Sequence, residues 1–186
     1  MLEDLICSDS VGSVSSAGDP GRWQRPPVGW MKINTDAAYT AANGRGATGV
    51  VLRNDQGVVL VGAARAYSNV ADVMMAEVMG ARDGVLLALE QGATKVLLET
   101  DNATLISLLN SDDGIQSVIV GFWHEVRELS LSFVSFACIH VKREGNEAAH
   151  LCACMPSASC PELSWFEPFP NWLKEATNKD CDGVMI

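Results

Sequence analysis

Three acidic residues that are far apart in the sequence have the side chains best suited to chemistry. Asp36 lies near the end of the first predicted strand, Asp101 at the end of a later strand, and Glu77 on a helix between them. If the two strands are parallel neighbours, both aspartates emerge at one edge of a sheet, and Glu77 reaches that edge from its helix. Converging carboxylates repel one another and raise each other's pKa values.

A divalent metal would resolve this repulsion. Mg²⁺, or Mn²⁺ in its place, binds a few carboxylates together with waters and phosphate oxygens, and two ions at about 4 Å can activate water and stabilise the leaving oxygen of a phosphodiester. The alternative stays open at this point, because an aspartate at a strand end is often a turn or cap residue and a helical glutamate is often solvated.

Alternating side chains predict the strand that carries Asp36, over residues 29–39. Two apolar runs follow, at 47–54 and 57–67, and the Asp55-Gln56-Gly57 turn between them is typical of a hairpin. We therefore expect three consecutive antiparallel strands at the start of the fold.

Residues 72–91 have the pattern of a helix that begins after Asp72 as its N-cap. Glu77 shares one stripe of this helix with small residues such as Gly84. Small residues let a helix approach a sheet closely, so we expect the carboxylate of Glu77 beside the sheet rather than in open water.

Helices and strands alternate in the following segments. They are a strand at 94–101, helices at 102–110 and 117–130, a strand at 132–143 and a helix at 145–155. Strands separated by helices favour parallel pairing, here added to the initial hairpins. The predicted fold class is α/β, with a mixed sheet covered by helices.

Both ends of the chain differ from this central part. Residues 1–28 are rich in small and polar side chains and have no amphipathic period, which predicts a disordered N-terminal tail. Residues 156–186 are proline-rich and are predicted to form an irregular C-terminal tail. One domain is therefore expected at 29–155.

The composition fits one globular domain with tails. A hydrophobic fraction of 48% in 186 residues excludes wholesale disorder. No apolar run approaches the ~20 residues of a membrane helix, and the acidic N-terminus is unlike a signal peptide. The net charge of −10 argues against broad electrostatic binding to phosphate, although not against an enzyme that meets phosphate through metal ions.

The six cysteines show no disulfide framework, which indicates reduced thiols. We therefore expect an intracellular protein, with nucleus and cytoplasm equally open. We also expect a monomer with no membrane partner.

The ordered set of segments resembles the type 1 ribonuclease H domain, and most of all the plant branch found in retroelement-derived and reverse-transcriptase-like proteins. These segments are INTDAA, the glycine turn, the two hairpin strands, MMAEVMGARDGVLLALEQGA, KVLLETDN and VKREGNEAAHLCA. The resemblance covers about residues 29–155. It implies a ribonuclease H-like, mixed five-stranded sheet, with three antiparallel strands and then parallel additions, flanked by helices.

The same resemblance implies an activity, namely Mg²⁺-dependent endonucleolytic cleavage of the RNA strand in an RNA–DNA hybrid. By position, Asp36 matches the first metal-binding aspartate of the family, Glu77 the helix glutamate and Asp101 the third acidic residue. In that chemistry Asp36 would bridge both ions, while the other two carboxylates hold the ions and order the attacking water.

The fourth catalytic position departs from the family pattern. Where the four-carboxylate set has an aspartate in the last helix, this sequence has His150. A neutral imidazole can bind a metal or orient water, but it adds no negative charge. A helix residue without any metal role is an equal alternative.

Contacts to nucleic acid are expected from Asn43 and Gly44 in the first turn, from Asn102 beside the carboxylates, and from Arg143 and Asn146 near the last helix. Amide and backbone contacts suit the wide minor groove of an A-like hybrid, where 2′-hydroxyls are exposed. Each of these residues is also compatible with ordinary turn chemistry.

Two further departures weaken the expected substrate affinity. Residues 110–118 are short and acidic where bacterial members have a basic protrusion, and residues 142–145 lack their mobile histidine. The leading hypothesis is therefore a hybrid-cleaving enzyme. The alternatives are a nucleic-acid-binding or interaction module with weak or no turnover, and a stable remnant of a larger retroelement polyprotein.

Overall fold

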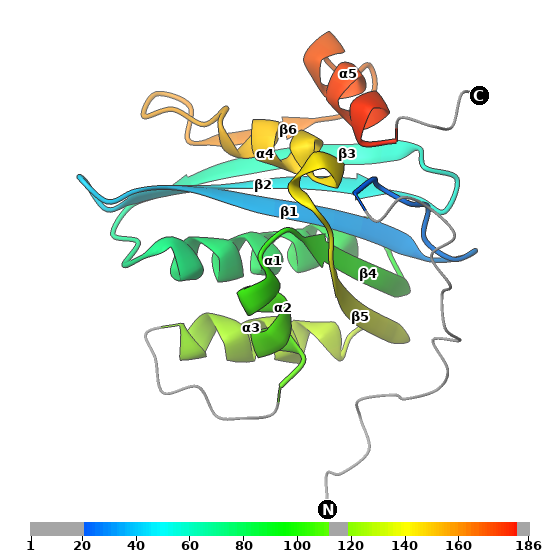
Figure 1. Cartoon of the computed structure of the whole chain (residues 1–186), viewed down its shortest axis with the longest axis horizontal. Coiled ribbons are helices and arrows are strands. Elements are labelled where there is room, and N and C mark those ends of the chain that lie inside the picture. Colours follow the sequence, from blue (N-terminus) through cyan, green and yellow to red (C-terminus); the bar gives the residue numbers. More distant parts are fainter. Residues whose placement is uncertain (1–20, 112–118, 182–186) are drawn as a thin grey trace, which may run out of the picture.

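The structure is a computed structural model that describes residues 21–111 and 119–181. Its elements in chain order are β1 (Met31–Thr40), β2 (Arg45–Arg53), β3 (Val59–Tyr67), α1 (Val73–Glu90), β4 (Lys95–Thr100), α2 (Ala103–Leu109), α3 (Val120–Ser130), β5 (Ser135–His140), the 3-10 turn η1 (Arg143–Gly145), α4 (Glu147–Ala153), β6 (Glu162–Trp165) and α5 (Asn171–Asp180). The helices lie on both faces of one sheet (Figure 1). The predicted α/β class with a mixed sheet is confirmed.

The sheet has the order β5-β4-β1-β2-β3-β6. β1, β2 and β3 form the expected antiparallel meander, and β4 and β5 add in parallel beside β1. β1 is therefore the central strand at which the pairing changes from antiparallel to parallel. The carboxyl end of β4 lies beside the parallel strand β1. An open α/β sheet usually places its functional site at the carboxyl ends of its strands.

Two apolar layers hold the helices onto the sheet. α1, α2 and α3 lie on one side of the sheet, and α4 and α5 lie on the other (Figure 1). The larger core joins α1 and α3 to the sheet, and a smaller one joins α4 and α5 to it. None of the helices in the described ranges combines the length and apolarity that a membrane crossing needs.

Glycines permit the close approach of helices on both faces. A Cβ atom at Gly84 of α1 would lie 2.7 Å from Ile33 Cγ2, which confirms the small-residue stripe predicted for this helix. On the opposite face, a Cβ at Gly49 of β2 would lie 2.1 Å from the carbonyl oxygen of Ala149 in α4. Both helices therefore pack directly on the strands. Any larger residue in place of these glycines would push the helices away from the sheet.

The prediction of an irregular segment at 156–186 is wrong for much of its length. Residues Glu162–Trp165 form β6, which pairs antiparallel with β3, so the sheet has six strands where five were expected. α5 follows and buries Leu173 and Ala176 against the α4 face of the sheet. Residues 182–186 lie outside the described part of the chain.

The predicted disordered tail at 1–28 also needs correction at its end. Residues 1–20 lie outside the described part of the chain, whereas Trp23 is buried. Its backbone N–H donates to the Asp180 carbonyl oxygen at 2.9 Å, and its ring lies against the guanidinium of Arg53. The N-terminal segment and α5 therefore pack together, and a buried indole that stacks on a cation and donates a hydrogen bond anchors them.

Candidate active site

Asp36 and Asp101 are next to each other where β1 and β4 separate. The parallel pairing of these strands ends at Thr35 opposite Thr100, and each aspartate is the next residue along its strand. Asp36 itself lies within β1, which continues to Thr40, and it is only 7% exposed. The expectation that the two aspartates emerge at one edge of the sheet agrees with this register.

Glu77 reaches this edge from the second turn of α1. It is 7% exposed, and its Oε2 atom has no hydrogen-bond partner in the described structure. Burial raises the pKa of Glu77 to about 8, and repulsion from Asp36 and Asp101 adds to the rise. The side chain of Asn102 opposes the shift by stabilising the charged form. The three predicted carboxylates therefore interact electrostatically, and within residues 21–111 and 119–181 Glu77 pairs with no lysine or arginine.

The pKa of Asp36 is raised in the same way, and one hydrogen bond opposes the rise. Burial raises the pKa of Asp36, and Asp101 raises it further, while the hydrogen bond from His150 acts in the opposite direction. His150 Nδ1 lies 2.7 Å from Asp36 Oδ2, so the imidazole N–H donates to the carboxylate. The structure therefore places His150 at the carboxylates, rather than on a part of the last helix away from them.

Two further polar side chains lie at this edge, one in the loop after β4 and one at the end of β5. Asn102 is the N-cap of α2, and its Oδ1 accepts a hydrogen bond from the backbone N–H of Leu105 at 3.0 Å. His140, at the end of β5, has its Nε2 atom 3.1 Å from the carbonyl oxygen of Asp101. Sequence reasoning missed His140 because its proximity depends on the register of β5 against β4, in which Thr100 pairs with His140.

The residues predicted to contact nucleic acid divide into exposed and buried ones. Asn43 and Gly44 form the exposed β1–β2 turn, where Asn43 Oδ1 accepts from the N–H of Arg45 and Gly44 has a φ of 60°. Arg143 is exposed in η1. Asn146 is different, since it is 1% exposed and its amide is bonded inside the protein. Its side chain is therefore not offered to a ligand in this structure.

The donor chemistry at this edge fits a hard divalent cation. Within the described ranges, no three carboxylate, imidazole or thiol groups are arranged to enclose a single ion. Mg²⁺ does not need such a cage, because it commonly keeps several waters and binds one or two carboxylates together with substrate phosphate. The unpartnered oxygen of Glu77 and the mutual repulsion of the carboxylates are what a cation would satisfy.

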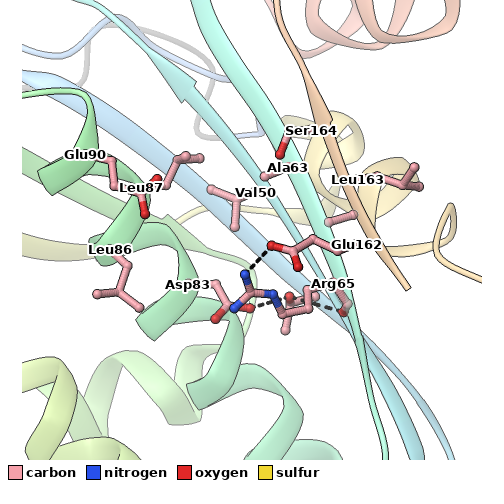
Figure 2. Close-up of a pocket in the computed structure, with 12 residues that line it drawn as sticks. Val50, Ala63, Arg65, Asp83, Leu86, Leu87, Glu90, Glu162, Leu163 and Ser164 are labelled. Carbon is pink, nitrogen blue, oxygen red and sulfur yellow. Dashed lines mark hydrogen bonds and ion pairs between the residues drawn. The ribbon is translucent and has the colours of Figure 1, made fainter. Parts of the chain in front are cut away.

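A cavity of about 140 Å³ lies elsewhere, between α1 and the β2, β3 and β6 strands (Figure 2). Four of its polar side chains are paired: Arg65 bonds Glu162, and Asp83 accepts from the Thr48 hydroxyl at 2.6 Å. The cavity has none of the four residues Asp36, Glu77, Asp101 and His150 in its lining. The candidate site is therefore the sheet edge, which suits a large ligand that lies across the surface.

The reverse transcriptase-like family matches residues 34–155, which is more than half of the chain. The chain belongs to this family and carries a ribonuclease H-like domain. An Arabidopsis thaliana protein named "Putative ribonuclease H protein" is 30% identical over 130 residues, which are 68% of this chain. The matched part is about one fifth (20%) of that longer protein.

Solved structures show the same fold. The N-terminal RNase H domain of a Mycobacterium tuberculosis protein aligns with a TM-score of 0.63 at 20% identity, over 67% of this chain and 91% of the other. RNase H1 from Halobacterium salinarum aligns with a TM-score of 0.63 at 21% identity, over 67% and 95%. LC11-RNase H1, solved with an RNA/DNA hybrid, has a TM-score of 0.60 at 14% identity, over 67% and 94%.

Proposed function

We propose that the chain is a Mg²⁺-dependent endonuclease that hydrolyses the RNA strand of RNA–DNA hybrids by two-metal phosphodiester cleavage, with Mn²⁺ as a possible substitute ion. The observation that carries this proposal is the group of carboxylates at the β1–β4 edge, in which the buried Glu77 has no lysine or arginine partner among the described residues. Membership of the ribonuclease H-like family supports it, as does the hybrid bound to LC11-RNase H1.

The carboxylates of Asp36, Glu77 and Asp101 would hold the metal ions. Bound divalent ions supply a nucleophilic water and stabilise charge on the leaving oxygen. His150 donates to Asp36 Oδ2 at 2.7 Å, and this bond fixes the orientation of that carboxylate. Asn102 stabilises the charged form of Glu77, so it keeps a second carboxylate ready to bind a cation.

The substrate would approach across the sheet edge rather than enter a deep cavity. Asn43 and Arg143 are the exposed candidates for contact with the hybrid backbone, and Gly44 is a half-buried one. Asn102 would act beside the scissile phosphate. Asn146 is a structural member of the site, since its amide is buried. The short acidic segment at 110–118 lies mostly outside the described residues, so its effect on substrate affinity stays a prediction.

Cleavage of a 5′-labelled RNA–DNA hybrid in Mg²⁺ tests this function directly. Asp36→Asn keeps the size of the side chain and removes its charge, so we expect cleavage to fall by about 10³-fold or more, which corresponds to about 4 kcal/mol of transition-state stabilisation. The matched control is Asp55→Asn, because Asp55 lies in the β2–β3 turn, where its carboxylate accepts a hydrogen bond from the backbone N–H of Gly29. Equal activity of wild type and Asp36→Asn would contradict the proposal.

A second candidate function is a hybrid-binding or interaction module with little or no turnover. The specific observation in its favour is His150, which replaces a carboxylate and bonds the central aspartate. The same labelled hybrid separates the two functions when binding is measured beside cleavage. Tight binding by wild-type protein without any product in Mg²⁺ or Mn²⁺ supports the module.

A further inference from the structure

Asn146 is the N-cap residue of α4, but its side chain does not cap that helix. An asparagine at this position ordinarily accepts a hydrogen bond from a backbone N–H of the first helical turn. Here the amide points to β1 instead. Its Nδ2 donates to the carbonyl oxygen of Thr35 at 2.9 Å, and its Oδ1 accepts from Asn34 Nδ2 at 3.1 Å. A local helix bond has therefore been replaced by two bonds between α4 and β1.

Both the nitrogen and the oxygen of the Asn34 side-chain amide form hydrogen bonds beside Asn146. Besides Asn146, its Nδ2 donates to Glu99 Oε2 at 2.8 Å, and its Oδ1 accepts from Trp23 Nε1 at 2.8 Å. Asn34 is completely buried, and the three residues that it bonds are also buried. Buried amides that are fully bonded tolerate little displacement, because each lost bond leaves a desolvated polar group without a partner.

These bonds connect the two elements that meet at the candidate active site. Asn34 and Thr35 directly precede Asp36 in β1. One helical turn after Asn146, His150 donates its backbone N–H to the Asn146 carbonyl oxygen at 3.1 Å. The contact of α4 with Gly49 sets how close the helix lies to the sheet. The two asparagines then fix the end of the helix from which His150 reaches Asp36.

We propose that Asn34 and Asn146 are positioning residues, which hold α4 so that the imidazole of His150 stays bonded to the carboxylate of Asp36. The structural part of this inference stands by itself. Its catalytic consequence rests on the proposed nuclease function. Neither asparagine would touch the substrate, and both would act through His150.

Asn146→Ser is the sharpest variant, because serine is itself a favourable N-cap. It removes both bonds to β1 while it lets α4 keep a capped N-terminus. The first readout is the ¹H–¹⁵N NMR signal of the His150 ring, which can be assigned because the chain has three histidines and His150→Gln removes one signal. We expect the hydrogen-bonded Nδ1 signal to broaden or shift towards that of a ring in water.

The second readout is hybrid cleavage. Changing a residue that orients a catalytic ligand typically costs about 10- to 100-fold in activity. We expect kcat to fall by about tenfold or more while KM stays within about twofold, because the exposed residues that contact the substrate are unchanged. A purely structural role would lower the fraction of active protein, and it would leave the ring signal of the folded molecules as in wild type.

The matched control is Asn54→Ser, in the β2–β3 turn. Asn54 Oδ1 also accepts two hydrogen bonds, from the N–H groups of Gln56 and Val58, but both bonds stay within the β2–β3 turn. We expect the His150 signal and kcat to stay as in wild type. If Asn146→Ser does not fold, Asn146→Asp serves instead, because it keeps the shape and the Oδ1 acceptor and replaces the donor to Thr35 with a carboxyl oxygen.

An unchanged His150 signal in folded Asn146→Ser or Asn146→Asp would overturn the inference. The outcome is independent of the proposed function, since the ring signal is measured without substrate. If the wild-type protein does not cleave hybrids but the variant shifts the ring signal, the positioning role is supported and the nuclease proposal fails.

Discussion

Buried carboxylates occur in two regions of this molecule, and the two regions treat their charge differently. Away from the candidate site, Glu99 pairs with Lys32 Nζ at 3.0 Å, and Asp180 pairs with Arg53. At the β1–β4 edge, neither Asp36 nor Glu77 pairs with a lysine or arginine in the described part of the chain. Their burial is similar to that of Glu99, so exposure to water does not explain the difference.

This difference separates carboxylates that stabilise the fold through internal ion pairs from carboxylates that can bind a ligand. A buried charge is costly unless it is paired, and folded proteins usually pair it internally. Glu99 and Asp180 follow that rule: Glu99 connects β4 to β1, and Asp180 connects α5 to β2. Asp36 and Glu77 break it, because burial raises their pKa values and the bonds from His150 and Asn102 only partly oppose that rise. An external cation is the partner that completes the second region.

The largest expected effect concerns the paired region. Glu99→Gln leaves the Lys32 ammonium buried without its anion, so we expect the free energy of unfolding to fall by about 3–5 kcal/mol. Glu77→Gln should instead raise it at pH 7, by up to a few kcal/mol, because the wild-type carboxyl, with a folded-state pKa of about 8, must take up a proton on folding and glutamine need not. Urea denaturation with a chelator present measures both values. Similar losses in the two variants would remove the distinction between the regions.

The pH dependence of stability gives the next effect. The pKa of Glu77 rises from 4.5 to about 8 on folding, so the folded state binds more protons than the unfolded state between these values. The free energy of unfolding of the metal-free protein should therefore fall as pH rises from about 4.5 to 8, by a few kcal/mol, and then level off. Glu77→Gln should lack most of this fall in the same urea series. A parallel slope in both proteins would show that Glu77 titrates normally.

The smallest effect is expected for an exposed pair. Arg65 bonds Glu162 at the β3–β6 edge, where the two side chains are 44% and 64% exposed. Water screens such a pair, so Glu162→Gln should change the free energy of unfolding by less than about 1 kcal/mol. Thermal denaturation at low and high salt measures it. A loss as large as that of Glu99→Gln would mean that the location of a carboxylate does not decide its contribution.

Local signals were enough to predict the central fold. The hairpin turn at Asp55–Gly57 and the N-cap Asp72 both occur as the sequence predicts, and Asp72 accepts from the N–H of Met75 at 2.8 Å. Helix and strand ends agree to within a few residues for the same reason, since turn and cap chemistry depends on neighbours in sequence. The convergence of Asp36 and Asp101 followed from the expected parallel pairing of their strands.

The features that sequence reasoning missed depend on contacts between distant segments. β6 has four residues, too few for a clear period, and it forms because β3 leaves an unpaired edge. The burial of the polar side chains of β1 could not be read from the sequence either, because alternating polar residues usually indicate a strand face turned to water. Lys32 and Asn34 are instead buried beneath Trp23. The burial of Asn146 has the same cause, since only the packing of α4 on β1 removes its amide from solvent.

The most direct test of the account is whether Mg²⁺ binds the unpaired carboxylates. We would measure the melting temperature during a Mg²⁺ titration, since an ion that binds only the folded state at 100 times its Kd adds about 2.7 kcal/mol. The account predicts a clear rise for wild type and for the control Glu162→Gln, and a much smaller rise for Glu77→Gln and Asp101→Asn. An equal rise in all four proteins would show that the ion binds elsewhere, and would contradict the central claim.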